Sequence, residues 1–391
     1  MARVLDTQLL RKIERHGSGG TLDVSACFNC GNCTAVCPLA EETAGFPRRI
    51  IRMAQVGMER ELLAGEDLWR CYECGECSRT CPRQADPAEF MAAARSYAIA
   101  RYDFTGLAGL VNRSIYGNLL VFALFSVIFE FVLSIKANPV GPQAKLFDFL
   151  PGWWIHNIGV VLFAVVGLSA AAGMLSMFVR FRAEEHSHES PLRLAALPAA
   201  IATGLSDALL HMRFRQCDSA EKDAETDEKP LPLRPWFVHA AVMGGFVAML
   251  IATTLDYLLK PIGSPVAPWY PMRLLGAAGG LVCLYGLTII LARRIRANQI
   301  PWRKSAFSDW FFPVLLYITV LTGLATEFAV YLPMRSFGNA IFFVHVVLAM
   351  DLIAMLPLTK FAHVLYRPLA LVLFAWRHAP EPATAAADVQ V

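Results

Sequence analysis

The chain is poor in charged residues: Asp, Glu, Lys and Arg make up only 17% of its 391 residues, whereas hydrophobic residues make up 56%. A soluble domain is usually about one quarter charged, so this shortage argues against a wholly soluble protein and favours one embedded in a membrane. The net charge of +3 is too small to indicate nucleic-acid binding. Residues 1–105 are richer in charge and indicate a water-soluble domain, and from about residue 114 the chain becomes apolar with short basic interruptions.

Two further features are missing. Residues 1–20 lack the continuous apolar core of a secretory signal peptide, which argues against an oxidising compartment and against disulfides. The sequence has neither a Rossmann glycine fingerprint nor a nucleotide-binding loop, so any flavin chemistry must belong to another polypeptide. We therefore do not expect an enzyme that is catalytically self-sufficient.

Eight of the ten cysteines form two copies of one arrangement, C-x2-C-x2-C-x3-C-P. Three thiolates at this spacing wrap one [4Fe–4S] cube, and the fourth, before proline, typically ligates the other cube. Zinc sites usually pair two CxxC units, which fits this spacing poorly. We predict two [4Fe–4S] clusters, the first held by Cys27, Cys30, Cys33 and Cys81, and the second by Cys71, Cys74, Cys77 and Cys37.

The cysteine-rich domain, residues 1–105, is expected to be mainly helical. Between the motifs, Pro47 and Gly65 suit the first turn and the end of one helix. Apolar residues at three- or four-residue spacing give this helix one buried stripe. A further helix is expected around residues 86–102.

Six apolar segments follow, each long enough to cross about 30 Å of hydrocarbon. They lie in an expected transmembrane domain of residues 110–370. Loop 181–234 combines an amphipathic helix from Leu192 to Phe214 with a charged linker, and residues 379–391 form a disordered tail. The predicted spans are 114–136, 154–180, 235–260, 271–293, 307–332 and 338–366.

The basic residues of the loops predict the orientation of the spans. Loops 181–234 and 294–306 are rich in Lys and Arg, whereas the opposite loops hold few. Because the number of spans is even, both termini are expected on the same side as these basic loops. The predicted location is the cytoplasmic (inner) membrane, with multiple spans and with the iron–sulfur domain in the cytoplasm.

Four histidines fall in or at the ends of spans, where ionisable groups are expensive and usually functional. His345 and His363 lie 18 residues apart on the sixth predicted span, which is five turns and about 27 Å, so both point to the same face of that helix, one near each membrane surface. This geometry suits two haems stacked across a bilayer. His239 has the depth to pair with His363 in one haem, and Gly244-Gly245 would let a flat ring approach, although small residues also simply pack helices.

The second haem would take His345 and either His156 or Met249. The alternative is that a buried histidine only links helices through hydrogen bonds. His16, His186, His188 and His378 are expected to be solvated, His211 to lie at the inner membrane surface, and Cys283 to be a small core residue.

Four carboxylates in the spans are candidates for a quinone site, because a quinone exchanges protons with its surroundings. We expect them to gather at one depth near the second haem, which would lie toward the outer membrane surface and is called the outer haem below. The alternative is that each carboxylate is solvated or ion-paired at the membrane interface. The candidates are Glu130, Asp256, Glu327 and Asp351.

These residues carry a resemblance to known families. Residues 20–100, with both cysteine motifs and the intervening PRRIIRMAQVG segment, resemble the iron–sulfur C subunit of heterodisulfide reductases. Residues 110–370 resemble their b-type cytochrome subunit and, more distantly, the gamma subunit of respiratory nitrate reductase, on His239, His345, His363 and the HMRFRQC stretch. In the nitrate reductase subunit a histidine stands where this chain has Met249. The order of the two modules resembles the C subunit of the quinone-interacting membrane-bound oxidoreductase, Qmo.

The expected fold class is all-α, with a helical ferredoxin-like domain for two clusters before a six-helix haem-binding bundle. The resemblance implies electron exchange between menaquinone and soluble flavin subunits like Qmo A and B, which serve adenylylsulfate reductase in dissimilatory sulfur metabolism. It leaves two alternatives open. One is a heterodisulfide reductase-type complex with another soluble acceptor, and the other is a membrane anchor that carries clusters but no haem.

Overall fold

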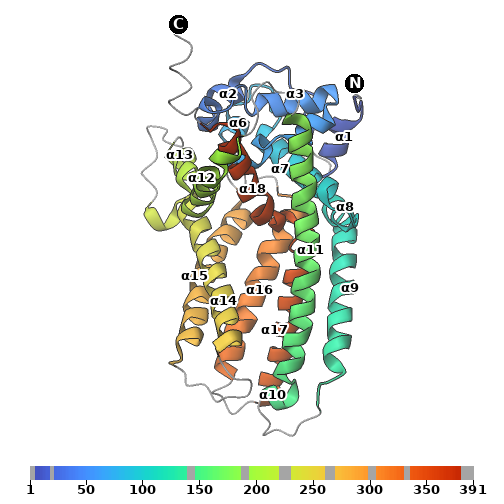
Figure 1. The fold of residues 1–391 in the computed structure, drawn as a ribbon, viewed down its shortest axis with the longest axis vertical. Coiled ribbons are helices and arrows are strands. Elements are labelled where there is room, and N and C mark those ends of the chain that lie inside the picture. The colour runs from blue at the N-terminus through green and yellow to red at the C-terminus, as the bar shows by residue number, and fades with distance from the viewer. Residues whose placement is uncertain are drawn as a thin grey trace.

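The computed structural model describes residues 5–17, 22–138, 146–185, 193–219, 230–259, 269–297, 305–329 and 335–379. Within these ranges the chain forms helices and no strand, which confirms the predicted all-α class. Figure 1 shows a compact helical domain resting on one end of a long helical bundle. We call the end of the bundle that carries this domain the domain end, and the opposite end the far end.

The cysteine-rich domain is made of short helices around one longer helix. The longer helix, α7, spans Pro87–Tyr102, close to the predicted 86–102. It begins with proline in its first turn, and the side chain of Asp86 accepts a hydrogen bond from the backbone of Glu89. The others are α1 (Leu9–Glu14), α2 (Asn32–Ala35), η1 (Pro38–Glu41), α3 (Arg48–Val56), α4 (Glu59–Ala64), α5 (Asp67–Arg70) and α6 (Glu76–Arg79).

The prediction of one helix from Pro47 to Gly65 is wrong, because the segment forms two helices, α3 and α4. The break is at Gly57, whose φ of 82° suits glycine. A Cβ at this position would lie 2.6 Å from the backbone oxygen of Asp6, so the chain passes too close for a side chain. The predicted apolar stripe is nevertheless buried at Ile50, Ile51 and Leu62.

Six described helices are long and apolar enough to cross a membrane. The first five coincide with predicted spans to within a few residues. The short helices α8 (Leu107–Arg113) and α10 (Leu146–Phe149) flank the first of them. The bundle helices are α9 (Ile115–Ser134), α11 (Gly152–Glu185), α14 (Pro235–Leu259), α15 (Pro271–Arg296), α16 (Phe307–Ala329) and α17 (Arg335–Met355).

The sixth predicted span, 338–366, is wrong as one continuous helix. Helix α17 ends at Met355, a turn and η4 (Lys360–Ala362) follow, and α18 (His363–Arg377) then begins. Pro357 explains the end, because proline has no backbone N–H and disfavours helical geometry in the residue before it. His345 and His363 therefore lie on different helices, and the five-turn argument that placed them on one face fails.

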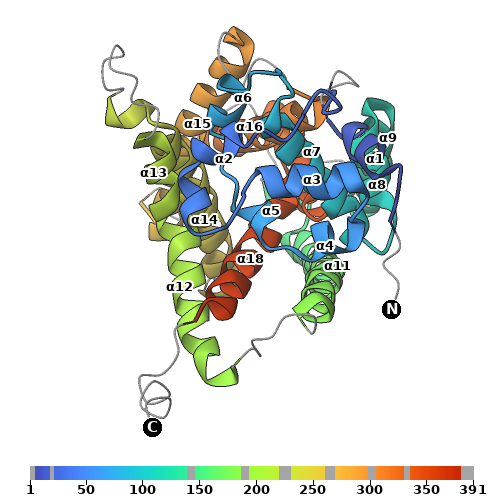
Figure 2. The ribbon, with the colours of Figure 1, turned by 90° about the horizontal axis from the view of Figure 1, so that it is seen from above.

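The predicted amphipathic helix between spans two and three is present as two pieces, α12 (Leu197–Leu210) and α13 (Met212–Ser219). The turns η2 (Leu194–Ala196) and η3 (Leu231–Leu233) precede α12 and α14. Helix α12 packs directly on α18, since a Cβ at Gly204 would lie 2.6 Å from the backbone nitrogen of Val372. Seen from above, α18 lies between α12 and α11 (Figure 2). The predicted charged linker and disordered tail lie almost wholly outside the described residues.

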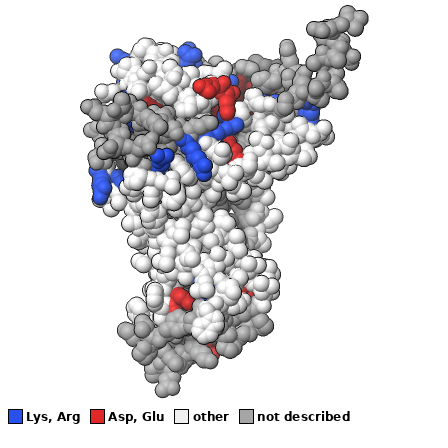
Figure 3. All heavy atoms as spheres, turned by 90° about the vertical axis from the view of Figure 1, so that its left-hand side faces the viewer, with Lys and Arg blue, Asp and Glu red and all other residues white. Residues whose placement is uncertain are grey.

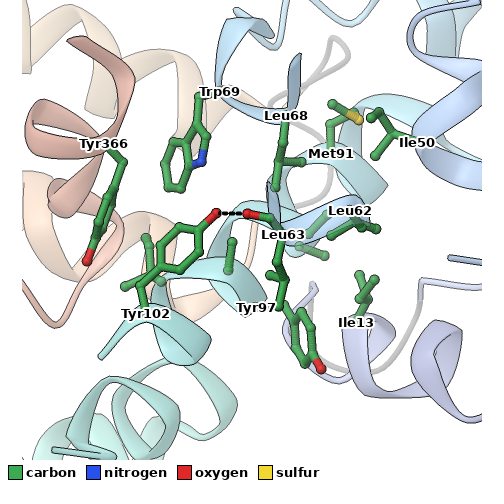
Figure 4. Close-up of a cluster of buried hydrophobic side chains, with 14 of the residues drawn as sticks. Ile13, Ile50, Leu62, Leu63, Leu68, Trp69, Met91, Tyr97, Tyr102 and Tyr366 are labelled. Atoms are coloured by element: carbon green, nitrogen blue, oxygen red, sulfur yellow. Dashed lines mark hydrogen bonds between the residues drawn. The ribbon is translucent and has the colours of Figure 1, made fainter. Parts of the chain in front are cut away.

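The domain and the bundle share one apolar core. Tyr366 of α18 packs its ring 5.1 Å from the centroids of both Trp69 and Tyr102 (Figure 4). The hydroxyl of Tyr102 donates to the backbone oxygen of Leu63 at 2.6 Å, and burial raises its pKa to about 12. This continuity joins α18 to the cysteine-rich domain, and it matters below because α18 begins with His363.

Charged side chains on the face drawn in Figure 3 gather over the cysteine-rich domain and at the far end. The band between them is uncharged on this face, and large apolar side chains such as Leu120, Phe131 and Leu168 are exposed along the spans. An uncharged, apolar belt between two charged ends is what a lipid bilayer requires.

Candidate redox site

The two cysteine loops have the same backbone conformation, which the repeated spacing anticipates. Asn29 and Gly31 have φ values of 63° and 92°, and the equivalent Glu73 and Gly75 have 55° and 88°. Left-handed residues in such loops turn successive backbone N–H groups to one side, a concavity that suits anionic groups including iron–sulfur clusters. A short helix follows each loop, and the side-chain amide of Asn32 in α2 bonds the Thr80 carbonyl after α6 at 2.6 Å.

The fourth cysteine of each motif lies beside the other motif. Burial raises the pKa of the Cys33 thiol, and Cys27, Cys30 and Cys81 add to the rise. Burial likewise raises the pKa of Cys37 to about 12, with smaller contributions from Cys71 and Cys74. Among the described residues, no three His, Cys, Asp or Glu side chains converge as closely as the ligands of a single metal ion. Cys33 thus lies near Cys81 of the second motif, and Cys37 lies near Cys71 and Cys74, while the crossed assignment stays a prediction.

Arginines contact the second motif. In the first motif Cys30 is exposed and Cys33 is buried, whereas Cys71, Cys74 and Cys77 of the second are all partly buried. The carbonyl of Cys71 accepts hydrogen bonds from Arg95 of α7 at 2.7 Å and from Arg367 of α18 at 3.1 Å. Two guanidinium groups thus stand beside the loop that faces the bundle.

Three histidines from different helices meet where the bundle reaches the domain. The ring centroids of His239 and His363 are 6.2 Å apart. His211, which the sequence analysis placed at the membrane surface, is buried here, with its ring centroid 4.9 Å from that of His239. The expectation of a surface histidine at this position is wrong.

The hydrogen bonds of these rings fix where their lone pairs lie. Nδ1 of His363 lies 2.9 Å from the Lys360 carbonyl oxygen, so it carries the proton and Nε2 keeps a lone pair. Nδ1 of His211 lies 3.1 Å from the Leu209 carbonyl, so its Nε2 accepts from Nδ1–H of His239 at 2.7 Å. His239 therefore also has its lone pair on Nε2. Burial lowers the pKa of His211 and lowers that of His363 to about 4, so both rings are neutral at pH 7, the form that binds metals.

A cavity of about 1090 Å³ connects the histidines with the second cysteine motif. Its walls include Cys71 and Cys74 on the domain side and His211, His239 and His363 on the bundle side. Apolar side chains such as Phe246, Leu287 and Phe312 form its deeper wall, and Arg293, Arg294, Lys360 and Arg367 also line it. This volume slightly exceeds the roughly 300–1,000 Å³ typical of small-molecule and cofactor sites.

Two aromatic rings bridge the two sides of this cavity. Tyr72, next to Cys71, stacks on Phe214 of α13 with centroids 4.9 Å apart. The Phe214 ring in turn lies edge-on to His239 at 6.0 Å, and the Arg367 guanidinium lies 3.7 Å from the centroid of the Tyr72 ring. Side-chain contacts therefore run without interruption from the second cysteine motif to His239.

The predicted ligands of the outer haem are not brought together. Nδ1 of His345 bonds the Thr319 carbonyl of α16 at 3.0 Å, and its ring packs on Gly323. The His156 ring lies 4.8 Å from that of Tyr257 in α14, and Met249 packs near Gly279 of α15. No hydrogen bond or ring contact among these described residues joins His345 to His156.

The four carboxylates do not share one depth, so that expectation is wrong. Asp351 follows Arg335, the far-end start of α17, by 16 residues or about 24 Å. It is fully buried, and its carboxylate accepts a hydrogen bond from Ser126 of α9 at 2.7 Å, whereas Glu130 lies one turn further toward the far end. Glu327 is ion-paired with Arg273 at 2.6 Å, and Asp256 lies in the last turn of α14.

Other sequence expectations meet mixed outcomes. His16 is buried against Tyr97, so its expected solvation is wrong, while His378 is exposed as expected. Cys283 is fully buried, as expected for a small core residue.

Gly245 packs α14 onto α15, whereas a Cβ at Gly244 would meet no described atom within 4 Å. No sequence signal indicates Arg367, whose role depends on a fold that brings α18 to Cys71, and His186 and His188 lie outside the described residues.

Known proteins match the cysteine-rich domain. Residues 23–85 match the 4Fe-4S dicluster domain family. The chain is 38% identical over 65 residues to the C subunit of the H(2):CoB-CoM heterodisulfide,ferredoxin reductase of Methanothermobacter marburgensis, covering 17% of this chain and 34% of that protein. It is 40% identical over 48 residues to the iron-sulfur C subunit of the CoB--CoM heterodisulfide reductase of Methanopyrus kandleri, covering 12% and 25%. The chain thus spans about a third or less of the length of these curated relatives, and no solved structure matches it.

The dicluster domain and the six apolar helices define a multi-pass, iron–sulfur electron-transfer protein of the membrane. Residues 117–388, more than half of the chain, match the family described as Citrate utilization protein B. The chain belongs to this family.

Proposed function

We propose that the chain is the membrane subunit of a redox complex and carries electrons between a soluble flavin partner and a membrane quinone. Reduced flavin gives up two electrons and two protons, and a quinone takes up two of each, so the chain has only to pass single electrons between them. The observation that carries this proposal is the single cavity lined both by Cys71 and Cys74 and by His239 and His363.

The residues around the cavity fit a b-type haem. His239 and His363 each have a lone pair on Nε2, and their ring centroids lie 6.2 Å apart, so these two imidazoles would hold the iron of one haem. The apolar wall suits the macrocycle, and the arginines and Lys360 that line the cavity suit its two carboxylates. When bound, the haem would be held by His239 and His363 and would supply one-electron transfer.

The second cluster, held by Cys71, Cys74, Cys77 and Cys37, contributes Cys71 and Cys74 to the wall of the cavity, and the first cluster contributes Cys81. Arg95 and Arg367 place positive charge beside the second cluster, and charge and hydrogen bonds around a cluster set its potential. The first cluster, held by Cys27, Cys30, Cys33 and Cys81, has the exposed Cys30. We infer that the first cluster exchanges electrons with the soluble partner and the second with the haem.

A second haem stays a prediction. His345 with His156 or Met249 would have to turn away from their present partners to share a metal. The packing of the His345 ring on Gly323 supports instead the alternative that this histidine links α16 and α17.

The quinone site is proposed near Asp351. This carboxylate is buried inside a span, and one of its oxygens has no hydrogen-bond partner among the described residues. The exposed Glu130 lies one turn beyond Ser126, which donates to this carboxylate. Such a pair can pass a proton between lipid-facing surface and buried site. Glu327 is the weaker candidate because Arg273 already neutralises it.

The family description favours a soluble partner that acts in citrate utilisation. The heterodisulfide reductase relatives match 65 residues or fewer of this chain, so they support the iron–sulfur chemistry more than the identity of the partner. A Qmo-type complex, with menaquinone and adenylylsulfate reductase, stays a prediction from the resemblance, and so does the cytoplasmic placement of the domain from its basic loops. The competing interpretation is a membrane anchor that carries clusters but no haem. The cavity lined by Cys71, Cys74, His239 and His363 favours the haem-binding interpretation over this one.

The test uses the full chain in liposomes with menaquinone-4, a quinone confined to the lipid. The clusters are reduced with a stoichiometric amount of dithionite, and their reoxidation is followed by freeze-quench EPR. We expect the wild type and a control, His378→Ala, to reoxidise at one rate and His239→Ala to be at least about tenfold slower. Equal rates in His239→Ala and the wild type would contradict the proposed route.

A further inference from the structure

A third histidine contacts the candidate haem site without a free ring nitrogen for a metal. His211 is only 5% exposed and comes from the loop region between spans two and three, far in sequence from His363. Both of its ring nitrogens are engaged, Nδ1 with the Leu209 carbonyl and Nε2 with Nδ1 of His239. His211 therefore cannot ligate a metal in this arrangement, but its hydrogen bond acts on the ring of His239.

The backbone conformation at His211 and the hydrogen bonds around it determine the direction of this side chain. His211 is the corner between α12 and α13, with a left-handed φ of 54° that is uncommon for a residue with a side chain. Its backbone N–H bonds the Asp207 carbonyl at 3.2 Å, and the Asp207 carboxylate pairs with Arg213 at 3.3 Å across the corner. The corner is therefore braced on both sides of the histidine.

The helix before this corner is also fixed in place. Gly204 of α12 touches the backbone of Val372 in α18, and α18 begins with His363. Helix α12 thus holds His211 at a set position relative to His363, while the hydrogen bond to Nε2 of His211 orients His239. The orientation of the two candidate ligands is coupled through one packed pair of helices.

We propose that His211 is a positioning residue that fixes the tautomer and ring orientation of His239 for metal ligation. A ligating histidine usually gives its second ring N–H to an acceptor, which orients the ring and makes it a stronger donor to the metal. The acceptor is here Nε2 of His211, whose Nδ1 is held by the Leu209 carbonyl. This inference rests on the proposed haem site.

The test compares three variants of the purified full chain. His211→Leu removes the acceptor, His211→Gln keeps one in its side-chain carbonyl, and His378→Leu is a control at an exposed histidine. Haem content, the EPR spectrum of the ferric haem and its midpoint potential are measured, and the EPR of the reduced clusters shows that each variant is folded.

We expect His211→Leu to bind haem about 10- to 100-fold more weakly, with altered g-values and a more positive midpoint potential, because His239 loses electron density. His211→Gln should restore the wild-type g-values. Unchanged spectra and potential in His211→Leu would overturn the positioning role while leaving the haem. Loss of all haem in both His211 variants would make His211 a ligand instead, and a wild type without haem would overturn this inference together with the proposed function.

Discussion

At the scale of single residues, the protonation of buried groups decides what the protein can do. Neutral histidines beside the cavity can bind a metal, whereas a charged one could not. A carboxylate buried in a span needs a partner or a function, because an isolated charge there is expensive. Among the described acids, Asp351 and Glu66 are the two most fully removed from water.

Asp351 is the residue on which the quinone proposal can be tested directly. Asp351→Asn keeps the size and the hydrogen bond with Ser126 but can no longer exchange a proton at neutral pH. We expect quinol-dependent reduction of the haem to slow by about 10²-fold or more, the usual contribution of a positioned proton-transfer group, with cluster EPR unchanged. Unaltered kinetics would remove Asp351 from the quinone site.

Glu66 gives a prediction for stability. Its side chain is 2% exposed and pairs with Arg377, but burial outweighs the pairing and raises its pKa to about 7 from 4.5. Between pH 4.5 and pH 7 the folded protein then binds more protons than the unfolded chain. The contribution of Glu66 to the free energy of unfolding is therefore full below pH 4.5 and is lost as the pH rises through 7. This lowers the free energy of unfolding by up to about 3 kcal/mol.

Glu66→Gln removes this titration while keeping a hydrogen-bonding side chain. As the pH rises from 5 to 8, the unfolding temperature of the wild type should therefore decrease relative to that of the variant. Parallel profiles for the two proteins would show that Glu66 stays ionised in its pair with Arg377.

At the scale of helices and loops, small residues and prolines set the geometry of the site. Gly245 lets α14 approach α15 so closely that a Cβ would lie 2.5 Å from the Gly279 carbonyl oxygen, whereas the adjacent Gly244 faces away from every described neighbour. Since α14 carries His239, the packing at Gly245 also sets the position of this histidine.

Gly245→Ala should lower the free energy of unfolding by about 1–3 kcal/mol through overpacking. Gly244→Ala is the matched control and should be neutral or slightly stabilising, because alanine favours a helix by about 1 kcal/mol. Thermal unfolding in detergent measures both. Equal effects of the two substitutions would mean that α14 and α15 are not in close contact here.

The crossed cysteine loops yield a pairwise prediction. Cys37→Ser should give the same cluster EPR spectrum as Cys74→Ser, because both damage the second cluster, and Cys81→Ser should match Cys30→Ser. A local arrangement would reverse the matches, with Cys37→Ser resembling Cys30→Ser.

The accuracy of the sequence predictions follows the range of the interactions behind them. The repeated cysteine loops and the first five spans depend on local spacing and hydropathy, and the structure contains both. The break after Met355 was missed because long apolar runs outweighed Pro357, and the break at Gly57 because the close approach of Asp6 is not local. His211 and Arg367 could not be predicted, since tertiary packing alone brings them to His239 and Cys71.

At the scale of the whole molecule, α18 is the element that ties the two parts together. It supplies His363 to the cavity, Arg367 to the Cys71 loop and Tyr366 to the shared core. Because these contacts lie on one helix, α18 connects the second cysteine motif directly to the histidines. We propose that electrons cross this junction through a haem.

The most direct measurement is the iron content of the purified full chain together with its reduced-minus-oxidised visible spectrum. Two [4Fe–4S] clusters account for about eight iron atoms per chain. We expect the wild type to contain additional iron and to show a b-type α-band. This band should disappear in His239→Ala and in His363→Ala, while the cluster signals persist. About eight iron atoms and no α-band in the wild type would contradict this expectation.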